Sequence, residues 1–228
     1  MLLPDALSFQ TSDTMINMIK AVIFDIDGVL LDSWEANIKF YQLLLEKSGY
    51  NVPSRKEIEG VFHLPMLDAI RQLAQETSDV RVREVWEMGR GREVRYPTEL
   101  LKIPEHSRDV VDTLDKTYRL AIVTSRVRLG VEDYFTISGL KQYFTVVVSY
   151  EDYTHPKPHP EPLLLALKKL KVKAGEAVYI GDSETDIQAA KAANTKIIVY
   201  SARPLQGADL NVESFLEIPE AIAELNRS

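Results

Sequence analysis

Short apolar runs alternate with helical patterns along most of the chain. The first run, MIKAVIF, begins at Met18, and LAIVT, TVVVS, AVYI and KIIVY follow it. Each run is short, rich in β-branched residues and bounded by polar or turn-forming positions, which predicts a buried strand. Helical spacing of apolar residues follows near 110–114, 129–137, 162–170, 185–193 and 219–225. Strands that alternate with helices predict an α/β fold, a doubly wound parallel sheet covered on both faces.

The stretch 33–103 differs, because it contains helical patterns and no strand pattern. Apolar positions there predict helices over 34–47, 66–76 and 79–95. Ser54 and Glu57 have the spacing of a capping box, which indicates one more helix start between the first two. We therefore expect an inserted all-helical cap domain at 33–103.

These patterns divide the chain into three parts. The core is expected at 18–32 and 104–228, with the cap between its two pieces. Residues 1–17 mix apolar and polar positions without a sustained period, which predicts a loose N-terminal extension. The sequence contains no internal repeat and no low-complexity segment.

Composition and charge exclude several classes of function. Of the 228 residues, 45% are hydrophobic and 27% are charged, with a net charge of -7, so nucleic acid is not an expected partner. The chain has no cysteine, which removes disulfides, thiolate nucleophiles and Cys-ligated metals. No apolar run reaches the roughly 20 residues that cross a bilayer, and no signal peptide is evident. We expect a cytoplasmic protein without a membrane partner; its oligomeric state leaves no signature in the sequence.

Acidic and hydroxyl side chains follow three of the predicted strands. They are Asp25 and Asp27 after the first strand, Thr124 and Ser125 after LAIV, and Asp182 after AVYI, with Asp186 one helical turn later. Ligands of a doubly wound sheet bind at the carboxyl ends of its strands, so these side chains are expected to converge. Two carboxylates 4 Å apart repel by roughly 4 kcal/mol at a dielectric constant near 20, which makes a cation necessary. Carboxylate oxygens without His or Cys favour Mg2+.

A phosphate group is the ligand that such a site would accept. Mg2+ binds phosphate oxygens as well as carboxylates. Lys157, in the loop HPKPHPEP, adds positive charge, and the hydroxyl and amides around Thr124 and Gly28 add hydrogen-bond donors.

Each candidate also has an ordinary structural interpretation. Lys157 between two prolines could be solvated surface, and Asp186 could be a first-turn acid favoured by the helix dipole. Asp32 and Ser33 have the character of an N-cap for the helix at 34–47 and are otherwise hinge candidates. The spacing of the four histidines forms no metal-ligand pattern, so His155 and His159 are expected to be surface residues.

Four motifs, in this order along the chain, resemble the signatures of the haloacid dehalogenase (HAD) superfamily. They are DIDGVLLDS, the TS that follows an apolar strand, Lys157 in KPHPEP, and GDSETD. The resemblance runs from Met18 to the C-terminal helix and is strongest to phosphatases with a helical cap, the group similar to phosphoglycolate phosphatase and β-phosphoglucomutase. It implies a HAD-like Rossmannoid core, Mg2+ as cofactor and a small phosphorylated metabolite as substrate.

The resemblance also implies catalytic roles. Asp25 would be the nucleophile that forms an aspartyl-phosphate. Asp27 would protonate the leaving oxygen and then activate water. Thr124 would hold the transferring phosphoryl group, and Lys157 would orient Asp25 and neutralise developing charge.

The remaining motif residues would bind the metal and the phosphate. Asp182 would be the acidic Mg2+ ligand, and Asp186 a supporting acid or a further ligand. Asp25 and the backbone carbonyl of Asp27 would complete the metal site. Backbone donors at Gly28 and Ser125 would bind phosphoryl oxygens.

Several residues differ from those of related enzymes, and these differences restrict which reactions we expect. Asn37 stands where similar hexose-phosphate mutases have a histidine, and Met66 where they have an arginine for a second phosphate, so hydrolysis of a phosphomonoester is favoured. A β-phosphoglucomutase-type phosphomutase and a pyrophosphatase remain alternatives. Asp27 is an acid that dehalogenases of the superfamily lack. His63, in VFHLPM, could face the pocket or lie on the surface.

Overall fold

A six-stranded parallel sheet organises the molecule. The computed structural model describes residues 18–62 and 64–227, so the predictions for 1–17 and for His63 lie outside the described residues. The sheet has the order β3-β2-β1-β4-β5-β6, and every neighbouring pair is parallel. Its strands are β1 (Ala21–Phe24), β2 (Arg119–Val123), β3 (Phe144–Val148), β4 (Ala177–Gly181), β5 (Lys196–Tyr200) and β6 (Leu210–Val212). The predicted parallel sheet is confirmed, with β6 as an additional edge strand.

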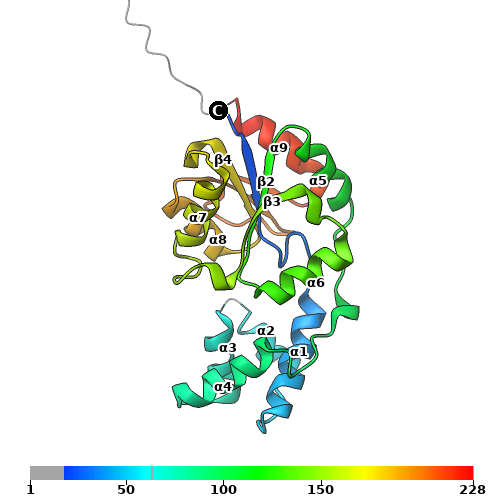
Figure 1. Cartoon of the computed structure of the whole chain (residues 1–228), viewed down its shortest axis with the longest axis vertical. Helices are drawn as coiled ribbons and strands as arrows, with labels where there is room; N and C mark the ends of the chain where they lie inside the picture. Colours follow the sequence, from blue (N-terminus) through cyan, green and yellow to red (C-terminus); the bar gives the residue numbers. More distant parts are fainter. Residues whose placement is uncertain (1–17, 63, 228) are drawn as a thin grey trace, which may run out of the picture.

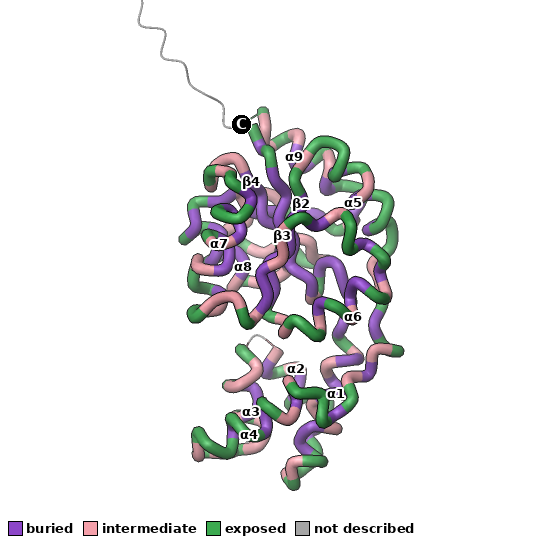
Figure 2. Tube along the Cα trace, in the orientation of Figure 1, coloured by how far each residue is buried: buried purple, intermediate pink, exposed green. Residues whose placement is uncertain are grey.

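Helices cover both faces of this sheet (Figure 1). One face carries α5 (Ser107–Asp115), α6 (Arg128–Ser138) and α9 (Ile218–Leu225), and the other carries α7 (Glu161–Leu170) and α8 (Glu184–Ala192). Strand β1 alternates between the two apolar layers, because Val22 and Phe24 pack into the first and Ala21 and Ile23 into the second. Figure 2 shows the buried residues concentrated along the strands between these helices. The predicted doubly wound α/β fold is confirmed.

A group of four helices, here called the helical part, lies beyond the end of the sheet toward which β1 runs (Figure 1). It consists of α1 (Trp34–Lys47), α2 (Arg55–Glu59), α3 (Met66–Ala74) and α4 (Asp79–Arg90). The helices share an apolar cluster of their own, which includes Phe40, Leu44 and Ile70. The capping box of Ser54 and Glu57 is present at the start of α2. None of the described helices is long and apolar enough to cross a membrane.

The predicted helix over 79–95 is wrong in length, because α4 ends at Arg90. Gly91 follows as the C-cap. Arg92 takes a left-handed backbone conformation with φ 59°, and a right-handed helix does not continue through such a residue. Arg92 instead donates a hydrogen bond to a carboxylate oxygen of Asp133 on α6, at 2.6 Å. This ion pair joins the helical part to the sheet part.

The two segments that connect the helical part to the sheet run antiparallel and pair with each other. The N–H of Asp32 donates to the carbonyl of Lys102 at 2.9 Å, and the N–H of Lys102 donates to the carbonyl of Asp32 at 3.1 Å. This pairing lies next to the predicted limits of the cap, 33 and 103. The division into a cap domain and a core domain remains a prediction.

Candidate active site

Strand register brings the predicted site residues to one edge of the sheet. β1 lies between β2 and β4, and its last residue, Phe24, is level with Ile122 and Ile180. The residues that follow these strands therefore leave the sheet side by side. Asp25 begins this edge, with its N–H donating to the carbonyl of Ile180 at 2.9 Å. The strand order also reverses at β1, which is where open α/β sheets bind ligands.

Lys157 lies at the centre of the site and not on the surface. Its side chain is 6% exposed, and its Nζ donates to Asp25 Oδ2 at 2.7 Å, Asp186 Oδ1 at 2.6 Å and Tyr179 Oη at 2.9 Å. Burial alone would lower the pKa of Lys157, but the charges of Asp186 and Asp25 hold it well above its usual value. The solvated-surface interpretation is wrong, and the site holds a permanent ammonium group.

Asp186 is fixed by the start of α8 as well as by Lys157. Its Oδ2 accepts hydrogen bonds from the N–H of Asp182 at 3.2 Å, the N–H of Ser183 at 3.1 Å and the Ser183 hydroxyl at 2.6 Å. Burial raises the pKa of Asp186, but the Lys157 charge and the bonds from Lys157, Ser183 and Tyr179 outweigh burial and hold the pKa below its ordinary value. Asp186 is thus both a helix-capping acid and an ionised member of the site.

Asp182 occupies space that a side chain at position 28 would fill. A Cβ on Gly28 would lie 1.8 Å from Asp182 Oδ2, and Gly28 has a φ of +74°, which favours glycine. Burial, followed by the negative charges of Asp186 and Asp25, raises the pKa of Asp182 well above its ordinary value. The DxDG turn and the GDSETD motif are therefore in direct contact.

Two buried acids, Asp25 and Asp186, and the partly buried Asp182 fit a divalent cation. Carboxylate oxygens of Asp25, Asp182 and Asp186 lie within 4.8 Å of one another. Burial, together with repulsion from Asp186 and Asp27, raises the pKa of Asp25 to about 7 despite its contact with Lys157. One ammonium group does not balance three carboxylates, and a donor set made only of oxygen suits Mg2+. Protein donors bond to both oxygens of Asp186 and also to both oxygens of Asp25, because Asp25 Oδ1 accepts the N–H of Ile26 and Oδ2 accepts Lys157 Nζ, so a cation would share these oxygens with their donors.

Asp27 points away from this cluster toward Arg126. Arg126 Nε donates to Asp27 Oδ2 at 2.8 Å and Arg126 Nη2 donates to Asp27 Oδ1 at 2.7 Å. The Ser33 hydroxyl also donates to Asp27 Oδ1. Ser33 is the N-cap residue of α1, as the sequence suggests, but the side chain that bonds to the helix start is that of Asp32, whose Oδ1 accepts the Trp34 N–H at 3.2 Å. Sequence reasoning missed Arg126, although it directly follows the TS motif.

Thr124 and Ser125 lie at the same edge but differ in exposure. Thr124 is buried, and its Oγ1 accepts the N–H of Arg126 at 3.1 Å. Its backbone carbonyl accepts the hydroxyl of Tyr153 at 3.2 Å. Ser125 is exposed. The phosphoryl-binding roles of both residues remain predictions.

The spacing of the histidines along the sequence forms no metal-ligand pattern, but the fold brings His155 and His159 next to Glu161. Nitrogen and oxygen atoms of His155, His159 and Glu161 lie within 4.8 Å of one another, an arrangement that could hold a metal ion. His155 and His159 are exposed, as expected. Atoms of these three residues already take part in hydrogen bonds within the loop. Glu161 accepts bonds from the N–H groups of Thr154 and His155, and His159 Nδ1 accepts the Glu161 N–H.

Comparison with known proteins finds relatives by sequence and by structure that are described as hydrolases or phosphatases. The family model of haloacid dehalogenase-like hydrolases matches residues 22–200. A pyrophosphatase PpaX from Bacillus pumilus is 32% identical over 182 residues, which cover 78% of this chain and 81% of that protein. The crystal structure of a HAD-superfamily hydrolase of subfamily IA from Geobacter sulfurreducens is 32% identical, with a TM-score of 0.69 and coverage of 90% of this chain and 96% of that chain. A structure described as a phosphoglycolate phosphatase, from Lactobacillus plantarum, is 25% identical, with a TM-score of 0.80 and coverage of 89% and 99%.

Sequence, fold and site agree with these relatives. Acids from two motifs and the lysine of a third converge at one sheet edge, as the resemblance implies. The matched region extends across the sheet from β1 to β5. The chain belongs to the haloacid dehalogenase-like hydrolases, where its relatives are phosphatases, and it is similar to structures described as phosphoglycolate phosphatase and β-phosphoglucomutase.

Proposed function

We propose that the protein hydrolyses a small phosphorylated metabolite with Mg2+ through an aspartyl-phosphate on Asp25. The observation that carries this proposal is the buried contact of Asp25 with Lys157, beside Asp182 and Asp186. A carboxylate held in place by a buried ammonium group and adjacent to a metal-binding acid is suited to attack phosphorus. Mg2+, when bound, would supply charge that screens the repulsion between Asp25 and a phosphate dianion.

The reaction divides between two aspartates. A carboxylate oxygen of Asp25 forms a bond to phosphorus while the bond from phosphorus to the leaving oxygen breaks, and Asp27 gives that oxygen a proton. In the second step Asp27 takes a proton from water, whose oxygen attacks the same phosphorus. Phosphate leaves and the Asp25 carboxylate is restored. Lys157 keeps Asp25 oriented in both steps, and the Thr124 hydroxyl and the N–H of Ser125 bind phosphoryl oxygens. The predicted phosphate donor at Gly28 is not included, because the N–H of Gly28 donates to the carbonyl of Leu31 at 3.0 Å.

The substitution Asp25→Asn tests the nucleophile. Hydrolysis of p-nitrophenyl phosphate in Mg2+ should fall by at least about 10^4-fold, because the amide does not attack phosphorus. The exposed Asp115→Asn, on α5, is the matched control and should keep the wild-type rate. Mass spectrometry of protein quenched during turnover should find a phosphoryl group on Asp25. An Asp25→Asn variant with a near wild-type rate would refute the assignment.

Pyrophosphate is a second candidate substrate. Curated relatives named pyrophosphatase PpaX are 30% identical over 220 residues, which cover 92% of this chain and 99% of the relative from Bacillus thuringiensis. A panel of pyrophosphate, phosphoglycolate and sugar phosphates, ranked by kcat/KM, separates the two candidates. A requirement for a bisphosphate primer would instead indicate a phosphomutase, which Asn37 and Met66 disfavour.

A further inference from the structure

Arg126 is a nearly buried charged residue without a role in the reaction described above. Its side chain is only 9% exposed, whereas that of Asp27 is 35% exposed. The guanidinium contacts the Asp27 carboxylate with two nitrogens, since Nε lies 3.0 and 2.8 Å from its two oxygens and Nη2 lies 2.7 Å from Oδ1. A two-nitrogen contact of this kind fixes the plane of a carboxylate as well as its distance.

Arg126 is itself held from several sides. Its N–H donates to Thr124 Oγ1 at 3.1 Å, and its carbonyl accepts the N–H of Tyr150 at 2.9 Å. Its guanidinium lies over the ring of Tyr96, 5.3 Å from the centroid, and Nη2 donates to the Tyr96 hydroxyl at 3.1 Å. The side chain that orients Asp27 is therefore anchored both to the sheet edge and to the segment that leads back from the helical part.

A chain of hydrogen bonds connects Arg126 to Asp27 by a second route. Tyr96 Oη donates to Asn37 Oδ1 at 2.6 Å, Asn37 Nδ2 donates to Ser33 Oγ at 3.2 Å, and Ser33 Oγ donates to Asp27. Together with the direct contact between Arg126 and Asp27, these hydrogen bonds close a ring. Each donor in the ring points from Arg126 toward Asp27. The ring includes the beginning of α1, through Ser33 and Asn37, and the segment that returns from the helical part, through Tyr96.

We propose that Arg126 is a positioning residue that sets the direction of the Asp27 carboxylate and links that direction to the segments joining the helical part to the sheet. The proposal rests on the proposed function, in which Asp27 transfers protons. Lysine at this position would supply the charge but not the two-nitrogen contact. Loss of Arg126 therefore affects proton transfer to the leaving group more than substrate binding.

The test compares Arg126→Gln and Arg126→Lys with two aryl phosphates at saturating Mg2+. The quantity compared is kcat/KM, which reports formation of the aspartyl-phosphate and not its later hydrolysis, in which Asp27 also takes part. With phenyl phosphate, whose leaving group needs a proton, kcat/KM should fall by about 10²-fold in Arg126→Gln. With 2,4-dinitrophenyl phosphate, whose leaving group does not need a proton, kcat/KM should fall by less than about threefold. Arg126→Lys should restore only part of the loss. Arg128→Gln is the matched control, because Arg128 is exposed and pairs with Asp152.

A second variant tests the proposal even if Arg126→Gln does not fold. Tyr96→Phe removes one hydroxyl from the ring but keeps the aromatic face under Arg126, and it should give the same leaving-group pattern with a smaller loss. Equal losses of kcat/KM for both leaving groups, or full rescue by Arg126→Lys, would overturn the proposal. Wild-type protein that hydrolyses no phosphate ester or pyrophosphate would overturn the proposed function as well, and this result differs from an active wild type with an unaffected Arg126→Gln variant.

Discussion

Gly28 illustrates how one absent side chain makes room for the candidate metal ligand. The oxygen of Asp182 occupies the position that a Cβ of residue 28 would take. The backbone at Gly28 is also left-handed, so any other residue there carries strain. The two contributions, steric and conformational, can be separated experimentally because the chain offers a second left-handed glycine in open space.

We expect Gly28→Ala to raise the Mg2+ concentration for half-maximal activity by about 10-fold or more, because the methyl group displaces Asp182. Gly49→Ala is the matched control, since Gly49 has a φ of +81° and a Cβ added there would meet nothing within 4 Å. The measurement is activity against Mg2+ concentration for both variants. Equal effects of the two substitutions would assign the loss to backbone strain and remove the argument for displacement of Asp182.

Individual site residues differ in how far the sequence predicts them. Asp25, Asp182 and Lys157 follow from motif order and strand ends, because a parallel sheet brings those ends together. Arg126 and Ser33 do not, because their contacts with Asp27 depend on where long or small side chains point after the helical part has packed. A helix-start serine looks like an N-cap in any sequence, and only the fold shows that its hydroxyl bonds elsewhere.

At the scale of elements, α1 has the bounds that the sequence predicts, 34–47, whereas α4 is shorter than predicted. Strand β1 is a short apolar run buried on both sides, which sequence patterns identify well. Helix α4 ends early because Gly91 and a left-handed Arg92 interrupt the pattern that predicts a helix as far as residue 95. Strand β6 has only 3 residues, too few to give an alternating pattern.

The stability of the helical part should depend on its own apolar cluster. Leu44 is fully buried in the cluster that holds α1 against α3 and α4. Leu44→Ala should lower the free energy of unfolding by about 2–5 kcal/mol, as cavity-forming substitutions do. Both tryptophans of the chain, Trp34 and Trp86, lie in this part, so urea unfolding followed by tryptophan fluorescence reports on it directly.

Val80→Ala is the control for this measurement, because Val80 lies on α4 and is 67% exposed. Its free energy of unfolding should stay within about 0.5 kcal/mol of wild type. A Leu44→Ala variant no less stable than Val80→Ala would contradict the assignment of a packed core to these four helices. A fluorescence transition at lower urea than the loss of helical circular dichroism would support the predicted separate cap domain.

For the molecule as a whole, the buried acids make stability depend on Mg2+ and pH together. Burial raises the pKa of Asp25 from 3.8 to about 7. The metal-free folded state therefore binds more protons than the unfolded state between these values, and its stability falls as pH rises through that window. In the proposed function Mg2+ would bind the ionised acids, so its stabilising effect would grow in the same direction.

We expect the Mg2+-induced increase in Tm to be small at pH 5 and several degrees larger at pH 8, and EDTA to reverse it. Differential scanning fluorimetry of wild type and Asp182→Asn across this pH range is the measurement. Asp182→Asn should lose most of the Mg2+ response. An equal Mg2+ effect at both pH values would contradict the coupling between the ion and the acids.

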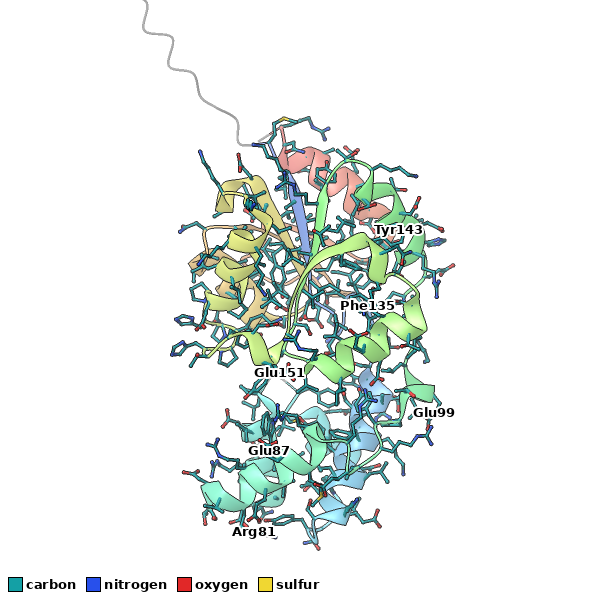
Figure 3. The ribbon with its side chains drawn as sticks, viewed as in Figure 1. Arg81, Glu87, Glu99, Phe135, Tyr143 and Glu151 are labelled. Atoms are coloured by element: carbon teal, nitrogen blue, oxygen red, sulfur yellow. The ribbon has the colours of Figure 1, made fainter. Side chains whose placement is uncertain are left out.

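The two parts of the molecule also differ in what they present to a substrate. Figure 3 shows Glu151 on the sheet part and Glu87 on the helical part, on the sides where the two parts approach each other. The residues that the sequence motifs identify all belong to the sheet edge. The identity of the substrate is expected to depend on the helical part, whose side-chain directions no motif specifies.

The paired backbone at Asp32 and Lys102 has a consequence for the history of such molecules. The polypeptide departs from the sheet and returns to it at neighbouring positions, so everything between them can be exchanged for another insert, or for a tight turn, while the strand order stays intact. A scaffold of this kind can acquire new selectivity by replacing one contiguous stretch of coding sequence. The aspartates at the strand ends need not be rebuilt each time, but a new insert has to replace the contacts of Ser33, Asn37 and Tyr96 that lead to Asp27.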